Sequence, residues 1–244
     1  MATVHATVGT ERGPRARETL AFWYGVPVRE DAVMTTAARP RSVAPIGLLS
    51  SAAAPVLLIG GWTAAAARQR GGFDSMTRTI SDLAALGADD RWLMTGALAG
   101  LGICHVTTAA ALRGAAPAGR AVLAGGGVAT VLVAVFPLPA DDSGSTAHTL
   151  VAGTAFLALS VWPALAARRD APGLLHPVPA GVAAATLLGL LAWFGVELSA
   201  DPDESGVGLA ERVTAGAQAL WPLAVVWGAA VAGLSTRRRR GRRP

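Results

Sequence analysis

Long apolar runs alternate with shorter polar segments along this sequence. A helix needs about 20 apolar residues to cross the hydrocarbon core of a bilayer. Six of the runs reach that length, and we therefore predict an all-α membrane bundle. Its transmembrane helices are expected at about residues 43–67, 92–112, 120–138, 147–166, 174–197 and 207–234. These helices leave no room for a separate soluble catalytic domain.

The basic residues, all arginine, are spread unequally between the two faces of this bundle. Sixteen of the 21 lie in the two tails and in the second and fourth loops, which share one face. Loops on the cytoplasmic side of a membrane carry an excess of arginine. We therefore predict a multi-pass protein of the plasma membrane with cytoplasmic N- and C-termini. Eleven of the 16 acidic residues then lie on the outer side.

Composition supports this class. The sequence is 52% hydrophobic with a mean hydropathy of +0.45, and its 15% of charged residues is below the roughly 25% typical of soluble domains. The net charge of +5 is explained by the arginine-rich loops and tails. Because no aromatic side chains alternate with this charge to stack on bases, we predict no nucleic-acid partner.

The two tails differ in character. Residues 1–42 lack sustained periodicity and are predicted to be a disordered cytoplasmic tail. Met34 has the context of a translation start ahead of the first helix, which leaves open whether residues 1–33 are translated. Residues 43–234 form the membrane domain, and residues 235–244 form a basic cytoplasmic tail. Its arginines, Arg237 to Arg240, Arg242 and Arg243, are expected to contact anionic lipid.

The first outer loop has a helical pattern of its own. Phe73, Met76, Ile80, Leu83 and Ala84 recur at helical spacing, with polar residues largely between them. This predicts a short amphipathic helix lying on the outer surface. The structural interpretation of this helix is a lid on the outer side of the bundle.

Small residues recur at four-residue spacing in three of the predicted helices. Such faces let helix backbones approach closely in lipid. We expect them to pack inside the bundle; an oligomer would use similar faces, but nothing in the pattern indicates one. The residues are Gly96, Gly100 and Gly102, then Gly125 to Gly127, then Gly181, Ala185 and Gly189.

Several titratable residues lie at predicted outer helix ends, where a polar side chain has little water and needs a partner. Arg212 lies inside an apolar span and is expected to pair with a carboxylate of Asp82, Asp141 or Asp142. Glu211 beside it is placed to favour the start of its helix. His148 follows two aspartates and several hydroxyls, a cluster suited to acid–base chemistry. With only one histidine on this face, we assign no metal and no cofactor.

His105 lies deeper, in the cytoplasmic half of the second predicted helix. A titratable group inside the membrane can serve as a proton relay. Alternatively, the ring is neutral and hydrogen-bonded to a neighbouring hydroxyl such as Thr107 or Thr108, or to a backbone carbonyl.

Short motifs in the loops resemble those of a bacterial membrane family, domain of unknown function 998. They are Thr79-Ile-Ser-Asp-Leu-Ala-Ala-Leu-Gly, Arg91-Trp92, Phe136-Pro137, His148 and Gly208-Leu-Ala-Glu-Arg, with Leu220-Trp221. The resemblance covers about residues 43–234 and implies a six-helix membrane protein without an assigned activity. The polar residues matched by position are Ser81, Asp82, His148, Glu211 and Arg212. After Phe136-Pro137 an acidic residue expected close behind is displaced to Asp141, which leaves the role of Asp141 open.

Three functions fit these residues. The leading hypothesis is an outer polar cluster that binds a lipid headgroup or small ligand through Ser81, Asp82, Asp141, His148 and the Glu211–Arg212 pair. The alternative is an enzyme acting on a lipid or cell-envelope substrate, with His148 as general base and Asp82 or Asp141 orienting it. The third is a proton-coupled transporter that uses His105.

Overall fold

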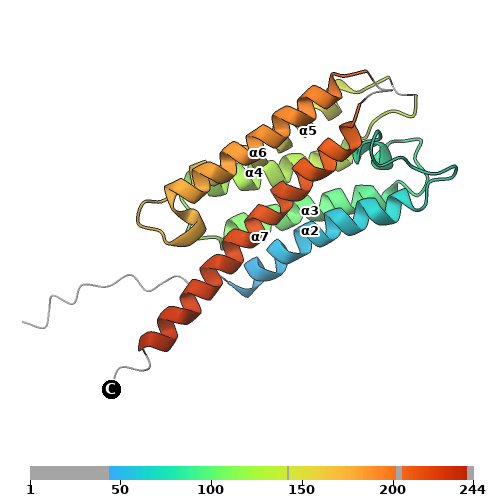
Figure 1. Cartoon of the computed structure of the whole chain (residues 1–244). Helices are drawn as coiled ribbons and strands as arrows, with labels where there is room; N and C mark the ends of the chain where they lie inside the picture. The colour runs from blue at the N-terminus through green and yellow to red at the C-terminus, as the bar shows by residue number, and fades with distance from the viewer. Residues whose placement is uncertain (1–43, 142, 202–204, 241–244) are drawn as a thin grey trace, which may run out of the picture. The chain divides into compact units, whose positions relative to one another are not determined.

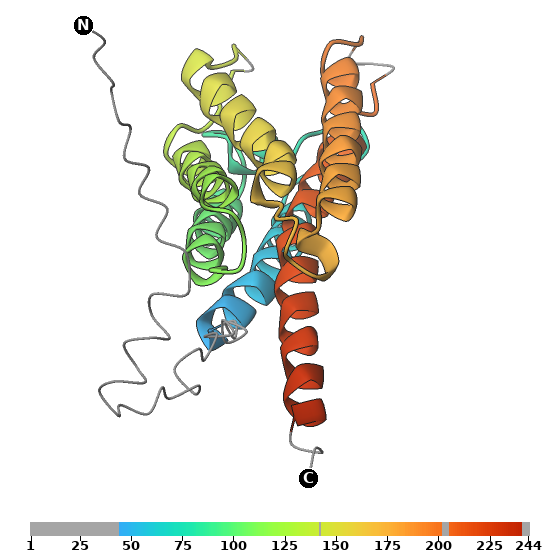
Figure 2. The same cartoon turned by 90° about the vertical axis from the view of Figure 1, so that its left-hand side faces the viewer.

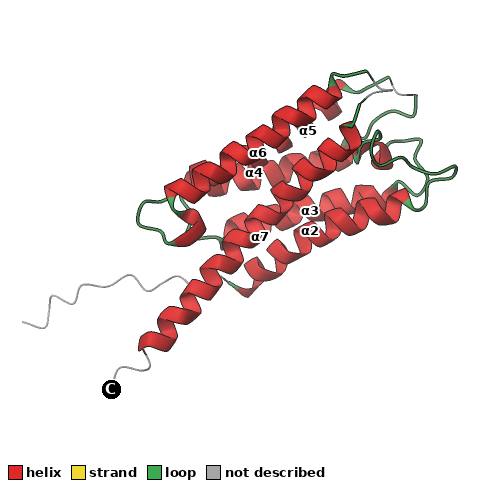
Figure 3. Ribbon diagram, in the orientation of Figure 1, coloured by secondary structure: helices red, strands yellow, loops and turns green. Residues whose placement is uncertain are grey.

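The computed structural model of the chain describes residues 44–141, 143–201 and 205–240, with residues 234–240 described as backbone only. These segments contain six long α-helices, two 3₁₀ turns and no strand (Figure 3). The helices are α2 (Pro45–Ala66), α3 (Trp92–Ala111), α4 (Pro117–Val135), α5 (Thr146–Ala166), α6 (Pro177–Leu198) and α7 (Val207–Arg240). The 3₁₀ turns are η2 (Ser81–Ala84) and η3 (Gly173–Leu175). The all-α prediction with six long helices is confirmed.

Proline explains why both ends of α4 differ from the expected boundaries. We expected 120–138 for the helix that runs from Pro117 to Val135. Pro117 occupies the first turn, where its missing N–H costs nothing. At the other end Pro137 disfavours helical geometry for Phe136, so the helix ends at Val135.

The last helix is longer than expected. We placed its end at 234, but α7 continues to Arg240. Arginine has a high helix propensity, and Gly241 is the next residue that weakens a helix. The part suited to span a membrane ends at Gly233. The predicted tail at 1–42 lies outside the described residues, as do Asp142 and residues 241–244 of the predicted tail at 235–244. The side chains of Arg237 to Arg240 are not described either.

The six helices form a closed ring. Each packs against its neighbours in the chain, and α7 also packs against α2. Figures 1 and 2 show the helices running alternately up and down, so that α2 begins and α7 ends at the same end of the bundle. Since α7 is the longest, it projects beyond α2 at that end (Figure 2).

The outward surface of the ring is apolar. Val56, Leu150 and Val182 have 70%, 65% and 62% of their surface exposed, and each of the six helices contains a stretch long and apolar enough to cross a membrane. Such extensive exposed apolar surface is unusual for a soluble monomer and is expected where lipid replaces water.

Inside the ring the apolar side chains form two clusters. One contains Leu58, Leu98 and Val133, with residues of the first loop. The other contains Leu123, Trp162 and Val226, nearer the end where α2 begins.

The first loop does not form the surface helix that we predicted over residues 73–84. Only η2 is helical, and Ile80, Leu83 and Ala84 are buried in the core. Side chains of α7 bind the backbone groups that a longer helix would pair internally, which removes the reason for helix formation. The loop is therefore a plug inserted into one end of the bundle.

Only some of the small-residue faces make close contacts between helices. A Cβ on Gly102 would lie 2.4 Å from the carbonyl oxygen of Gly127, so α3 and α4 can approach only because both positions are glycine. By contrast, Gly181 and Gly189 on α6 would meet no heavy atom within 4 Å. Internal packing is thus observed for α3 and α4.

Candidate functional site

Apart from His105, the described polar residues selected from the sequence lie at one end of the bundle, which we call the loop end. Its described part is formed by residues 67–91, 136–141, 143–145, 199–201 and 205–206. At this end three of the residues make a hydrogen-bonded row, while the others have separate structural roles.

The row consists of His148, Ser81 and Glu211. Nε2 of His148 lies 3.2 Å from Oγ of Ser81, and that hydroxyl lies 3.4 Å from Oε1 of Glu211. Nδ1 of His148 lies 2.8 Å from the carbonyl oxygen of Phe136. His148 and Glu211 are buried, with 6% and 4% of their surface exposed. Residues from α5, the first loop and α7 therefore share one buried hydrogen-bond system.

Local structure explains how the sequence builds this row. Ser145 caps α5 and its hydroxyl accepts the backbone N–H of His148. The helix α4 ends just before Phe136, which leaves that carbonyl free to accept from the imidazole. On the other side, Glu211 accepts the backbone N–H of Ile80 and so fixes Ser81 next to its own carboxylate.

The hydrogens available to the row restrict its charge states. The Phe136 carbonyl can only accept, so Nδ1 of His148 carries a hydrogen. The two contacts of the Ser81 hydroxyl need one hydrogen each, and the hydroxyl supplies only one. The other comes from a protonated Glu211 beside a neutral His148, or from a protonated His148 beside an ionised Glu211. When both contacts are made as hydrogen bonds, the row therefore holds one dissociable proton.

We had predicted that Arg212 pairs with a carboxylate, and this prediction is wrong. Its Nη1 donates to the backbone carbonyls of Ser75, Arg78 and Gly208 at 3.0, 2.8 and 2.8 Å. Backbone carbonyls of the loop were thus nearer than any acidic side chain described. The guanidinium holds the first loop against α7, and no Glu211–Arg212 ion pair is present among the described contacts.

Asp82 also has a structural role. Its carboxylate accepts the N–H of Thr79 at 2.8 Å, and the Thr79 hydroxyl accepts the N–H of Asp82 at 3.1 Å. This reciprocal pattern resembles a capping box and lies one residue ahead of Ile80, the N-cap residue of η2. Asp82 also lies 4.0 Å from Arg78.

Asp141 is exposed and bonds to Ser143 at 2.7 Å. The hydroxyl and N–H of Ser143 lower the pKa of the Asp141 carboxyl below its usual value. The ring nitrogens of His148 contact Phe136 and Ser81, so the expectation that Asp82 or Asp141 orients His148 is wrong.

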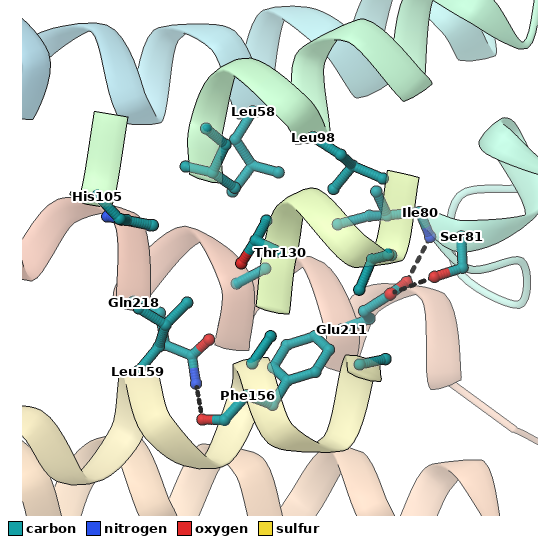
Figure 4. A pocket seen from close by; sticks show the side chains of 15 residues that line it. Leu58, Ile80, Ser81, Leu98, His105, Thr130, Phe156, Leu159, Glu211 and Gln218 are labelled. Carbon is teal, nitrogen blue, oxygen red and sulfur yellow. Dashed lines mark hydrogen bonds between the residues drawn. The ribbon is translucent and has the colours of Figure 1, made fainter. Parts of the chain in front are cut away.

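A narrow cavity of about 50 Å³ begins at the row and extends into the bundle. Figure 4 shows Glu211 and Ser81 at one end of it and His105 at the other. Its walls come from α2, α3, α4, α5 and α7 and are mostly apolar. The remaining polar residues on its surface are Thr130 and Gln218.

His105 lies at the inner end of this cavity with 1% of its surface exposed. Neither ring nitrogen has a hydrogen-bond partner in the described structure. The hydroxyls that we expected to bind it are used elsewhere: Thr107 bonds to the Ile103 carbonyl, and Thr108 lies 2.8 Å from the Ser50 hydroxyl.

Sequence reasoning missed Gln218 and Ser50. Gln218 donates to the Phe156 carbonyl and to Ser160, both at 2.9 Å. Both missed residues are polar and lie inside apolar spans, a signal that could have identified them. Within the described ranges, no three His, Cys, Asp or Glu side chains are grouped to hold a metal ion.

Six helices that are long and apolar enough to cross a membrane form a closed ring, and titratable side chains face its interior. These features define a multi-pass integral membrane protein. A model of the family described as Protein of unknown function (DUF998) matches residues 51–228. The chain therefore belongs to this family, as its loop motifs indicated. No curated protein and no solved structure matches it.

Proposed function

We propose that this membrane protein takes up and releases a proton at the His148–Ser81–Glu211 row, as the proton-handling site of a proton-dependent membrane process. The distribution of arginines supports placing the loop end outside the plasma membrane, with both termini in the cytoplasm. In that orientation the C-terminal arginines lie against anionic lipid of the inner leaflet.

The observation that carries this proposal is that one hydroxyl, that of Ser81, contacts both a buried carboxyl and a buried imidazole. Ionisable groups inside a membrane bundle are costly and typically mark proton or ion pathways. Two other charged side chains act on Glu211: Arg212 on α7 and Asp82 on η2. The cavity walls from α2, α3 and α4 bring no further charged group.

The geometry favours proton exchange over nucleophilic catalysis. In a serine nucleophile system, the histidine lies between the hydroxyl and the carboxylate. In this row the Ser81 hydroxyl lies between His148 and Glu211. A hydroxyl in that position relays a proton between the two groups, and the adjacent carboxylate would oppose negative charge developing on a substrate.

A second candidate function is ligand binding at the same end of the cavity. Among the described residues, no basic nitrogen lies within ion-pair distance of the Glu211 carboxylate. This environment suits a protonated amine, whether from a lipid headgroup or from a small solute. The cavity admits a group of only a few atoms, and the carboxylate disfavours an anionic group.

Infrared difference spectroscopy between acidic and alkaline pH tests the proton proposal. Wild-type protein should show the carbonyl band of a protonated carboxylic acid that Glu211→Gln abolishes. Asp141→Asn is the control, because Asp141 is an exposed carboxylate outside the row, and it should keep the band. A difference spectrum unchanged by Glu211→Gln would refute the proposal.

Ser81→Ala tests whether the hydroxyl contacts the Glu211 carboxyl. We expect the carboxylic acid band of Glu211 to move in frequency in this variant, because the hydroxyl beside Oε1 is lost. A band at the wild-type frequency in Ser81→Ala would mean that the hydroxyl does not bind the carboxyl.

Native mass spectrometry that resolves bound lipids tests the amine candidate. Wild type and Glu211→Gln are compared after exposure to phosphatidylethanolamine, to phosphatidylglycerol and to free ethanolamine. Preferential binding of the first lipid identifies a headgroup, and binding of ethanolamine alone identifies a solute. Equal binding by wild type and Glu211→Gln in every arm would exclude this use of the site.

A further inference from the structure

The His148–Ser81–Glu211 row does not explain why the bundle contains a buried histidine at position 105. This imidazole is almost completely buried and lines the cavity, and both of its ring nitrogens are unpartnered. Leaving a buried hydrogen-bonding atom unsatisfied costs about 1–3 kcal/mol. A bundle that needed only an apolar filler here would be more stable with leucine. The imidazole of His105 is therefore positioned to bind a molecule in the cavity that can both donate and accept hydrogen bonds.

The dimensions of the cavity indicate that occupant. On α3 the lining runs from Leu98 to His105, and on α7 it runs from Glu211 to Gln218. Seven residues of helix rise about 10 Å, so the cavity is long for its volume of about 50 Å³. Such a volume holds about three water molecules. A length of about 10 Å arranges them in single file between Glu211 and His105.

Polar groups continue on the far side of His105. One helical turn further along α3, the Thr108 hydroxyl lies 2.8 Å from the hydroxyl of Ser50. Ser50 in turn lies 3.3 Å from the carbonyl oxygen of Gly47, in the first turn of α2. That turn is at the end of the bundle opposite the loop end (Figure 1).

We infer that these groups form one proton path through the bundle, from the His148–Ser81–Glu211 row through a file of water to His105 and on to the Thr108–Ser50 pair. The inference rests on the proposed function of the row. It extends that function from proton binding at one end of the bundle to proton passage across the bundle.

Each transfer in this path is balanced. As a water molecule gives a proton to one ring nitrogen of His105, it accepts another proton from the water on its Glu211 side. His105 then gives the proton on its other ring nitrogen to the Thr108 hydroxyl, which passes its own hydrogen to the Ser50 hydroxyl. Ser50 in turn releases its hydrogen at the end of the bundle where α2 begins. One proton enters and one leaves, no electron moves, and water is the only co-reactant. A tautomer change of the imidazole resets the path.

Proton flux into sealed vesicles tests the path. The full chain is reconstituted in phosphatidylcholine vesicles containing a pH-sensitive dye, and a potassium diffusion potential drives protons inward. We expect flux above that of protein-free vesicles. His105→Leu should lower it by about tenfold or more, since a relay group typically contributes at least that factor, and Thr108→Val should lower it several-fold.

Two matched controls separate the path from general damage. His176→Leu removes an exposed imidazole, and Thr107→Val removes a hydroxyl that bonds only to its own helix. Both should keep wild-type flux. If His105→Leu does not fold, Thr108→Val against Thr107→Val still decides the question.

The outcomes distinguish the two proposals. If wild type conducts no better than protein-free vesicles, or if His105→Leu and Thr108→Val both conduct as wild type does, the path is wrong. The row keeps its proposed function in that case, provided that the carboxylic acid band depends on Glu211. If the carboxylic acid band does not depend on Glu211 while the flux is intact, the proposed role of the row is wrong and protons enter the path elsewhere.

Discussion

The Glu211 carboxylate near the start of α7 accepts the backbone N–H of Ile80, 131 residues earlier in the chain. The next side chain, Arg212, binds carbonyl oxygens of the same loop. Adjacent residues on one helix thus bind the loop backbone through both its donors and its acceptors. This clamp turns the first loop into the plug that closes the cavity.

Arg212→Met should destabilise the protein. Three hydrogen bonds from a charged donor are lost, and the carbonyls of Ser75 and Arg78 lose this partner. We expect the free energy of unfolding to fall by about 3 kcal/mol, measured by thermal or denaturant unfolding in detergent. Arg70→Met, in a side chain that is 91% exposed, is the control and should change little. Equal stability of the two variants would contradict the clamp.

Gly208→Ala should detach the first loop from α7. The added Cβ would lie 2.2 Å from the Arg78 carbonyl oxygen and 2.7 Å from that of Ser75. These are backbone atoms, so relief requires the loop to move, at a cost of about 2 kcal/mol. Gly189→Ala meets no atom within 4 Å and should be neutral or stabilising by up to about 1 kcal/mol. Limited proteolysis of the first loop, compared between the two variants, checks the prediction.

Asp82→Ala should reduce stability without removing the Glu211 carboxylic acid band. It removes the acceptor for the Thr79 N–H, a capping interaction worth about 1 kcal/mol. Asp82→Asn keeps an acceptor oxygen and should lose less. The carboxylic acid band of Glu211 should be retained in both variants. Its disappearance in Asp82→Asn would show that Asp82 belongs to the proton site.

Gly127→Ala should separate α3 from α4. The new Cβ would lie 2.6 Å from the Gly102 carbonyl oxygen, in the middle of two helices that have little freedom to shift. A loss of about 1–3 kcal/mol is expected. Gly125→Ala, two residues away and free of neighbours within 4 Å, serves as the control in the same unfolding measurement. Similar midpoints for both would place the close contact elsewhere.

The sequence by itself determined the number, type and approximate limits of the helices. Apolar runs of spanning length are local features, and prolines such as Pro117 mark a boundary without any tertiary information. The sequence also indicated which polar residues are out of place in lipid, because Glu211, Arg212 and His105 each occur within an apolar run. The family motifs also pointed to Glu211 and Arg212.

Only the tertiary structure decided how those residues are used. Asp82 and Ser81 are adjacent in the sequence, yet Asp82 binds the backbone N–H of Thr79 and Ser81 joins the proton row. Which side chain meets which depends on loop contacts between residues more than 100 positions apart, and helical periodicity carries no information about them. Arg212 bound backbone carbonyls because the packed loop placed them closer than any described carboxylate. His105 lacks a partner because helix packing left a cavity beside it, and no local pattern encodes the shape of a cavity.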